Sequence, residues 1–196
     1  MLDQQFAKPN GWIGKAVGWF MTQENDELNK WTVSFLDIQE GDAVLEIGFG
    51  AGESLCQVAR RSRGRVFGID PSEAMVETAV RRLQKRSPAC DICLIQGEAA
   101  LIHQFETTFD KIYAVNNITY WEKPVETLVH LRSLLSEGGR IALTLCPHEK
   151  GAEDQTTEVL GGQLRALLNQ AGFSSIEVFI KPTKPNNTVC AVAMNQ

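Results

Sequence analysis

The sequence predicts an α/β fold, in which a doubly wound, seven-stranded, mostly parallel sheet with an antiparallel last strand is preceded by N-terminal helices. Two observations carry this prediction. From residue 43 onward, short apolar runs alternate with amphipathic helical segments, and the runs are apolar throughout, as in parallel strands that helices cover on both faces. The last two runs are joined only by PTKPNN, which is too short for a crossover and predicts an antiparallel pair.

The individual elements follow from composition and from the residues that start or stop helices. Helices are predicted where apolar residues recur at helical spacing, and the pair Gly138–Gly139 is interpreted as a helix stop. Two further helical segments, over residues 12–21 and 25–38, precede the first strand. The predicted strands are residues 43–48, 65–70, 91–96, 109–115, 140–146, 175–181 and 188–194, and the helices between them are residues 53–61, 71–86, 124–135 and 157–172.

Length and composition indicate one globular domain that does not bind nucleic acid. The chain has 196 residues, 43% of them hydrophobic, and a net charge of −5, whereas phosphate backbones favour a positive face. No apolar run reaches the roughly 18 to 20 residues of a membrane span, and the N-terminus lacks the layout of a signal peptide, so a cytoplasmic location is expected. Cys90 and Cys93 form a C-x-x-C without a second Cys/His pair, so no metal is predicted.

Three glycines mark a candidate ligand site. In VLEIGFGAGES, residues 44–54, Gly48, Gly50 and Gly52 alternate between a predicted strand and a predicted helix, where doubly wound folds bind nucleotides. Their spacing fits neither the dinucleotide pattern G-x-G-x-x-G nor the P-loop pattern G-x-x-x-x-G-K-[ST]. Glu46, two residues before the first glycine, would repel a pyrophosphate, but it suits a ligand that carries positive charge.

The pattern E-x-G-x-G-x-G resembles the first motif of the class I S-adenosylmethionine-dependent methyltransferases, and later segments resemble further motifs of that family in the same order. GIDPSEAM resembles its second motif, QGEAALIHQFETTFDKIYAV its third region, and LLSEGGRIALTL its turn into the fifth strand. The resemblance covers residues 40–196. It implies a Rossmann-like methyltransferase fold with S-adenosyl-L-methionine as the cofactor.

The resemblance also implies which residues hold the cofactor. Asp70 would accept hydrogen bonds from the ribose hydroxyls, although it could also cap the following helix, while Glu98 and Ala99 would meet the amino edge of the adenine. Asn116 is assigned to the methionine end, with a turn-forming role as the alternative. The full predicted cofactor set is Glu46, Gly48, Phe49, Gly50, Gly52, Asp70, Pro71, Met75, Gly97, Glu98, Ala99 and Asn116.

The catalytic residues are harder to predict, because methyl transfer from a sulfonium is an in-line displacement that requires mainly placement. An acceptor that carries a proton needs a base, and Tyr120, Glu122 and His148 lie near the ends of the fourth and fifth strands. The alternative for His148 is that it is a solvated loop histidine without a catalytic role. After the fourth strand the chain has NNITYW rather than Asn/Asp-Pro-Pro-Tyr, which argues against amino-methylation of nucleic-acid bases.

The N-terminal segment is rich in tryptophan. Trp12, Trp19 and Trp31 lie outside the predicted sheet, so residues 1–39 are interpreted as a helical lid or cap on a cofactor-binding core at residues 40–196, within a single domain of residues 1–196. Plain packing on the sheet is one alternative, and a homodimer or lipid surface is the other.

These observations predict methyl transfer from S-adenosyl-L-methionine to a small-molecule acceptor, with no nucleic-acid partner. An RNA or protein methyltransferase would share the cofactor-binding core and is one alternative. An NAD-dependent oxidoreductase is a second, although the glycine spacing is wrong for it. A cofactor-binding protein without activity of its own is a third.

Overall fold

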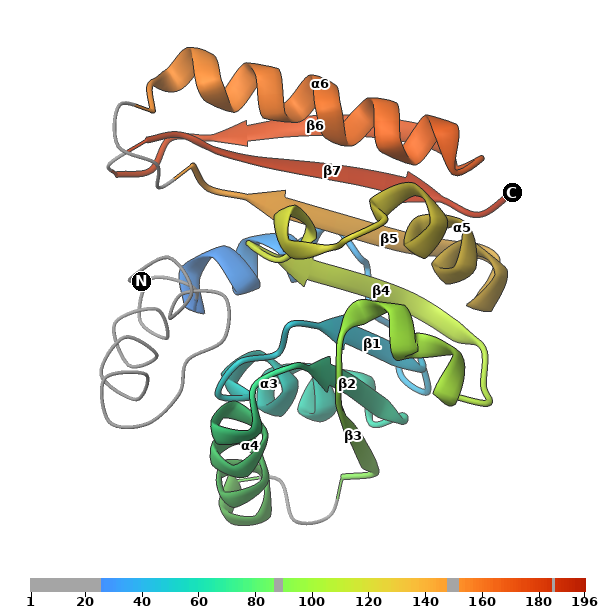
Figure 1. Cartoon of the computed structure of the whole chain (residues 1–196). Helices are drawn as coiled ribbons and strands as arrows, with labels where there is room; N and C mark the ends of the chain where they lie inside the picture. The colour runs from blue at the N-terminus through green and yellow to red at the C-terminus, as the bar shows by residue number, and fades with distance from the viewer. Residues whose placement is uncertain (1–25, 87–89, 148–151, 185) are drawn as a thin grey trace.

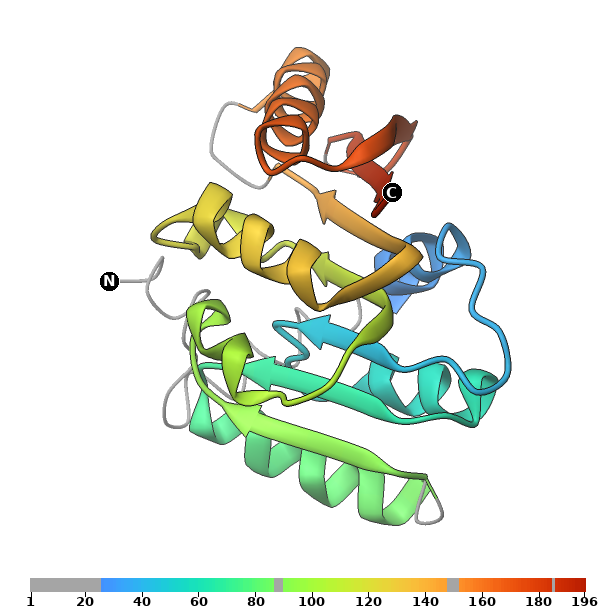
Figure 2. The same ribbon diagram turned by 90° about the vertical axis from the view of Figure 1, so that its right-hand side faces the viewer.

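A computed structural model confirms the predicted fold class and describes residues 26–86, 90–147, 152–184 and 186–196. Seven strands form one sheet in the order β3-β2-β1-β4-β5-β7-β6 (Figures 1 and 2). The strands are β1 (Val44–Ile47), β2 (Val66–Asp70), β3 (Ile92–Gln96), β4 (Phe109–Val115), β5 (Leu135–Leu145), β6 (Ser174–Lys181) and β7 (Thr188–Met194).

Strand β7 runs against its neighbours. Strands β3, β2, β1, β4 and β5 pair in parallel, whereas β7 pairs antiparallel with both β5 and β6. Strands β6 and β7, which a short connection joins, therefore form the predicted antiparallel pair. From β1 the chain crosses over to β2 on one side, and from β4 it crosses over to β5 on the other side. The strand order therefore reverses between the neighbouring strands β1 and β4. Sheets of this kind bind ligands at the carboxyl ends of the strands at such a point.

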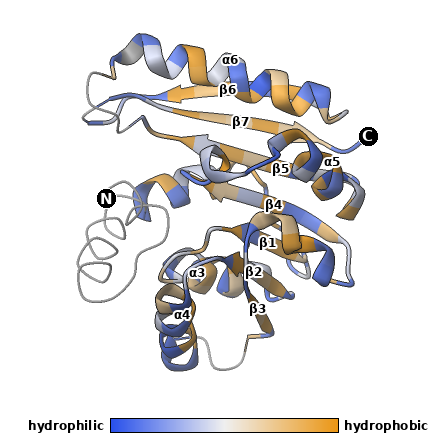
Figure 3. Ribbon diagram, viewed as in Figure 1, coloured by the Kyte–Doolittle hydropathy of each residue, from blue (hydrophilic) through white to orange (hydrophobic). Residues whose placement is uncertain are grey.

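Helices cover both faces of the sheet, which explains the continuously apolar strands. One hydrophobic cluster joins the sheet to α5 (Pro124–Leu134), α6 (Asp154–Gln170) and the 3-10 helix η1 (Ala99–Gln104). The other joins it to α3 (Glu53–Ser62), α4 (Glu73–Arg86) and the segment that contains Leu36 and Ile38. In Figure 3 the strands are largely hydrophobic and α4 is largely hydrophilic, as expected for a solvent-facing helix on a buried sheet.

The predicted start of β5, at residue 140, is wrong, whereas the predicted end of α5 agrees with the structure to within one residue. The helix ends at Leu134, and β5 already begins at Leu135, so Gly138 and Gly139 lie inside the strand rather than at a helix stop. Leu135 is buried and pairs with Phe109, after which the register shifts before Lys111 pairs with Arg140. Burial of Leu135 thus fixes the strand start, and Gly138, with φ of 74°, belongs to the irregularity that follows.

The N-terminal prediction is described only in part. Residues 1–25, which include the predicted helix 12–21 and most of the predicted lid, lie outside the described residues, as does His148. A helix covers residues 26–34, within the predicted 25–38, and its Thr32 hydroxyl lies 2.6 Å from that of Thr144 on β5. Phe35 stacks on Phe179 of β6 with ring centroids 4.5 Å apart. Among the described residues, no helix has the length and apolarity to cross a membrane.

Candidate cofactor-binding site

In the loop between β1 and α3, every second residue has a positive φ, a backbone conformation that favours glycine. Gly48, Gly50 and Gly52 have φ values of 77°, 52° and 76°, in the left-handed region where side chains are strained. A Cβ on Gly48 would overlap the side-chain amide of Asn117, and one on Gly52 would lie 2.8 Å from the Cβ of Ala79. Gly48 and Gly52 therefore reflect both the dihedral angles and close packing, whereas Gly50 reflects the dihedral angle alone.

Asp70, the last residue of β2, holds this loop by its carboxylate. Oδ2 of Asp70 accepts a hydrogen bond from the Gly50 amide at 2.8 Å, and Oδ1 accepts one from the Ser72 amide at 2.9 Å. Burial raises the pKa of Asp70, these two amides oppose the shift, and Glu98 adds to it. Each oxygen keeps a lone pair for a further donor. The Ser72 contact shows that Asp70 also organises the start of α4, so both roles predicted for it are compatible.

A cavity of about 190 Å³ opens beside Gly48, at the carboxyl ends of the parallel strands. Five residues of the predicted cofactor set line it, together with apolar side chains from β1 and β2 and with three residues that follow β4. A larger cavity of about 520 Å³ adjoins it through shared wall residues such as Glu98 and Trp121. The lining residues of the smaller cavity are Ile47, Gly48, Ile69, Pro71, Gly97, Glu98, Ala99, Asn117, Tyr120 and Trp121.

Seven members of the predicted set do not line this cavity, and two of them, Phe49 and Met75, are buried apolar side chains. Phe49 is buried, and its ring packs against Gly68 of β2 so closely that a Cβ on Gly68 would lie 2.6 Å from the ring. Met75 is buried in the first turn of α4, where its amide bonds to the carbonyl of Ser72, and it does not line the cavity. Both side chains are therefore buried and form no part of the cavity wall.

The structure separates the two asparagines that follow β4. The side-chain oxygen of Asn116 accepts a hydrogen bond from the amide of Cys146 at 2.7 Å, which ties the ends of β4 and β5 together. Asn117, which the sequence analysis did not select, lines the cavity and accepts a hydrogen bond from the indole of Trp121 at 2.5 Å. The sequence signal was the Asn-Asn pair itself, but adjacent residues in a turn give no indication of which one faces a ligand.

Glu46 is a buried acid on the other side of the loop. It is 3% exposed on β1, in register with Tyr113 of β4, which hydrogen-bonds to it. Burial raises the pKa of Glu46 well above its usual value, the hydrogen bond from Tyr113 opposes the shift, and Asp70 adds to it. Its Oε2 has no hydrogen-bond partner among the described residues, which is costly for a buried oxygen. This orphaned oxygen fits a ligand that brings a donor or a positive charge.

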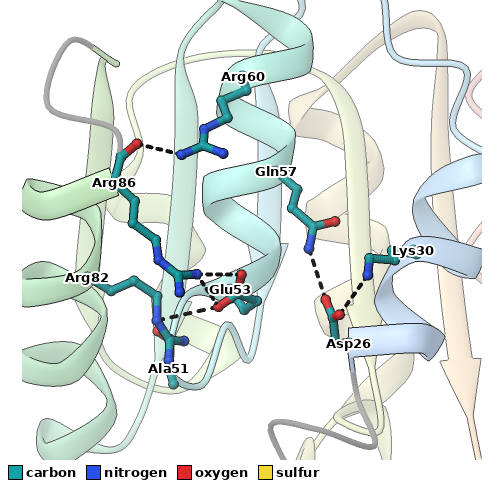
Figure 4. Close-up of polar contacts among 8 residues, drawn as sticks. All are labelled: Asp26, Lys30, Ala51, Glu53, Gln57, Arg60, Arg82 and Arg86. Atoms are coloured by element: carbon teal, nitrogen blue, oxygen red, sulfur yellow. Dashed lines mark hydrogen bonds and ion pairs between the residues drawn. The ribbon is translucent and has the colours of Figure 1, made fainter.

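The glycine loop is also held from outside by α4. Arg82 donates a hydrogen bond to the carbonyl of Ala51 at 2.7 Å, in the middle of the loop, and its Nε lies 3.5 Å from Glu53 at the start of α3 (Figure 4). Glu53 in turn accepts two hydrogen bonds from Arg86, at 2.7 and 2.8 Å. On the opposite side of α3, Gln57 bonds to Asp26 of the N-terminal helix. Side chains of α4 therefore fix the position of the loop.

We expect Arg82→Ala to weaken binding of S-adenosylhomocysteine about fivefold to tenfold, since the loop loses a side-chain hydrogen bond worth about 1 kcal/mol. Global stability should change by less than about 1 kcal/mol, because the pair with Glu53 is partly exposed to solvent. Arg81→Ala is the matched control, since Arg81 lies on the same helix and pairs with the exposed Glu77. Calorimetric titration checks the prediction, which fails if the two variants bind equally well.

The candidate catalytic residues lie at the rim or outside the described region. Tyr120 lines both cavities and is 50% exposed, and Glu122 is exposed on the wall of the larger one. His148 lies among the residues that the structure does not describe. Across the described ranges, no three His, Cys, Asp or Glu side chains are grouped as metal ligands would be.

Comparison with known proteins identifies the family. A family model described as a methyltransferase domain matches residues 44–139, from β1 into β5. The chain is 36% identical over 178 residues to the uncharacterized methyltransferase YdaC of Bacillus subtilis (strain 168), a match that covers 90% of this chain and 96% of YdaC. The chain belongs to the class I S-adenosylmethionine-dependent methyltransferases.

Solved structures share the fold of this methyltransferase. A SAM-dependent methyltransferase from Aquifex aeolicus superposes with a TM-score of 0.69 at 21% identity, over 86% of this chain and 89% of that one. The magnesium protoporphyrin IX methyltransferase of Synechocystis PCC 6803, solved with bound SAM, has a TM-score of 0.64 at 20% identity, over 100% and 89% of the two chains. At these identities the likeness concerns the fold of the methyltransferase, not its acceptor.

Proposed function

We propose that this methyltransferase binds S-adenosyl-L-methionine in the site formed by the glycine loop and transfers its methyl group to a small-molecule acceptor. The observation that carries the proposal is the pair of buried acids that flank the loop. Asp70 and Glu46 are 6% and 3% exposed, and Glu46 retains an oxygen without a partner among the described residues. Two acids suit a ligand with a diol and a positive charge, and they disfavour a pyrophosphate.

The residues that would hold the cofactor follow from this arrangement. Asp70 has lone pairs for the ribose hydroxyls, while Glu98 and Ala99 line the cavity where the resemblance assigns the adenine edge. Glu46 and the backbone of Gly48 would take the methionine end. Asn117 lines the same cavity and is added to the proposed contacts, while Asn116 acts through the junction of β4 and β5.

When bound, the cofactor supplies a methyl group on a sulfonium, whose positive charge already activates the leaving group. The residues of the chain therefore contribute placement and exclusion of water rather than a covalent intermediate. Tyr120, on the rim of the cavity, is our candidate for contact with the acceptor, and His148 is a second candidate. We also propose that residues 1–39 cap this rim and that residues 40–196 form the cofactor-binding core.

A small-molecule acceptor is supported by the net charge of the chain. The net charge of −5 disfavours binding of a nucleic acid, whose affinity depends on cations placed against phosphates. An RNA or protein acceptor is the second candidate, and it would be favoured by salt-sensitive micromolar binding of RNA.

The test is calorimetric titration of the purified full chain with S-adenosylhomocysteine, with NAD as the control ligand. We expect binding of S-adenosylhomocysteine and none of NAD. Transfer of labelled methyl groups to a panel of small molecules, to bulk RNA and to proteins then distinguishes the acceptor classes. Binding of NAD without S-adenosylhomocysteine would overturn the proposed cofactor, and labelling of RNA or protein alone would overturn the small-molecule acceptor.

A further inference from the structure

We propose that Tyr113 and Ser54 are positioning residues for the cofactor. They orient Glu46 so that one of its carboxyl oxygens is left for the cationic end of the ligand. Cofactor binding then releases the proton that Glu46 holds in the free protein. The inference rests on the proposed function, because it requires a cation-bearing cofactor at the glycine loop.

The three side chains form a buried hydrogen-bonded chain across three elements. Tyr113 of β4 is fully buried, and its hydroxyl lies 2.7 Å from that of Ser54 in the first turn of α3. The same hydroxyl bonds to Glu46, its cross-strand neighbour on β1. Since an ionised carboxylate only accepts, Tyr113 then donates to Glu46 and Ser54 donates to Tyr113. One donor from the chain thus orients the carboxylate.

The hydroxyl of Tyr113 lies in largely apolar surroundings. Tyr113 belongs to the apolar cluster that includes Val44, Leu55 and Ala142, where a phenylalanine would pack without a buried polar atom. Burial of a hydroxyl is unfavourable unless it is hydrogen-bonded, and the partner here is a residue of the proposed cofactor site. The tyrosine is therefore better explained by its effect on Glu46 than by core packing.

The free protein has no described positive charge facing Glu46. The titratable groups that act on its carboxyl are Tyr113 from β4 and Asp70 from β2, and neither is a cation. Charged groups at the start of α3 and in the N-terminal helix form ion pairs with other residues: Glu53 with Arg82 and Arg86, and Asp26 with Lys30. An ionised Glu46 would thus be buried beside a second acid, with the hydrogen bond from Tyr113 but without a compensating positive charge among the groups that act on it.

Burial accordingly raises the pKa of Glu46 well above its usual value, and the acid tends to keep its proton when no ligand is bound. A ligand cation placed near Oε2 lowers that pKa again and expels the proton. Affinity for the cation-bearing ligand should then rise with pH over the range in which Glu46 of the free protein is still protonated.

The experiment titrates the full chain with S-adenosylhomocysteine between about pH 6 and 9, in two buffers of different ionisation enthalpy, so that the number of released protons is measured directly. For wild type we expect net proton release. Tyr113→Phe should weaken binding about tenfold, since a hydrogen bond to a charged group is lost, and should move the rise in affinity to higher pH. Ser54→Ala should act in the same direction with a smaller effect.

Two controls separate positioning from stability. Thr157→Val removes another fully buried hydroxyl, which donates to the carbonyl of Asn187 at 2.8 Å, far from the glycine loop in the sequence and on a different helix. It should leave both affinity and proton release unchanged. 5′-Methylthioadenosine, which lacks the amino-acid end, should bind with no proton release and should bind wild type and Tyr113→Phe equally well.

The outcomes distinguish the two proposals. If wild type binds S-adenosylhomocysteine without proton release, or if Tyr113→Phe and Ser54→Ala retain wild-type affinity and pH dependence, the role of Tyr113 is overturned while the proposed function stands. If wild type does not bind S-adenosylhomocysteine, both are overturned. The wild-type proton count needs no variant, so misfolding of Tyr113→Phe leaves the inference open to refutation.

Discussion

Asp70→Ala is expected to abolish measurable binding of S-adenosylhomocysteine, with a loss of affinity of at least about 100-fold. The substitution removes two things at once. It removes the buried acceptors proposed for the ribose hydroxyls, and it removes the carboxylate that holds the Gly50 amide at 2.8 Å and so fixes the glycine loop. Two hydrogen bonds to a charged group, each worth about 1.5 to 3 kcal/mol, account for a loss of this size.

Comparison with two further variants assigns this loss. Asp70→Asn keeps one acceptor oxygen and should bind more strongly than Asp70→Ala but more weakly than wild type. Asp110→Ala is the matched control, because Asp110 also accepts a backbone amide, that of Ala43 at 2.9 Å, but at the opposite end of the sheet. Calorimetry measures the affinities, and thermal unfolding shows whether each variant is folded. A folded Asp70→Ala protein with wild-type affinity would refute the assignment.

Glu46→Gln is expected to weaken binding of S-adenosylhomocysteine and, at the same time, to stabilise the free protein relative to wild type above about pH 5. The amide keeps an acceptor for Tyr113 but cannot ionise, so the ligand cation loses its counter-charge. An affinity loss of about tenfold to 100-fold corresponds to one hydrogen bond to a charged group. Affinity for 5′-methylthioadenosine, which lacks the cationic amino-acid end, should remain at the wild-type level.

The stability effect has a definite sign. Because the pKa of Glu46 is raised in the folded protein, its contribution to stability is fully present below the pKa of the unfolded chain and is lost as pH rises through the folded value. Wild type should therefore lose stability relative to Glu46→Gln from about pH 5 upward, by roughly 1.4 kcal/mol for every tenfold difference in proton affinity between the folded and unfolded chains. Denaturant unfolding between about pH 5 and 9 checks this, and parallel curves for the two proteins would contradict it.

A site with two buried acids is poorly stabilised until its ligand binds. Burial raises the pKa of both Asp70 and Glu46, so both carboxyls favour the protonated form more than usual in the free protein. A ligand that supplies hydroxyl donors and a positive charge relieves both penalties. We therefore expect S-adenosylhomocysteine to raise the unfolding temperature of wild type, and to raise that of Glu46→Gln less at the same concentration.

The sequence by itself determined the fold class, the approximate positions of the strands other than the start of β5, and the segments that form the candidate site. These features depend on short-range signals. Continuous apolar runs specify strands covered on both faces, and alternate glycines between a strand and a helix specify a loop with left-handed backbone, as found at Gly48, Gly50 and Gly52. Asp70 could be selected because it ends the strand that follows the loop, so its position depends only on chain order.

Only the tertiary structure decided which of neighbouring side chains line the cavity. The side chain of Asn116 bonds to the amide of Cys146, directly after β5, whereas Asn117 lines the cavity. The contact of Asn116 depends on a segment 30 residues away. Leu135 starts β5 early because its partner, Phe109, is buried. Tyr113 looked like one more apolar strand residue until the register of β1 and β4 placed it beside Glu46. Contacts between distant segments decide such choices, and local patterns do not encode them.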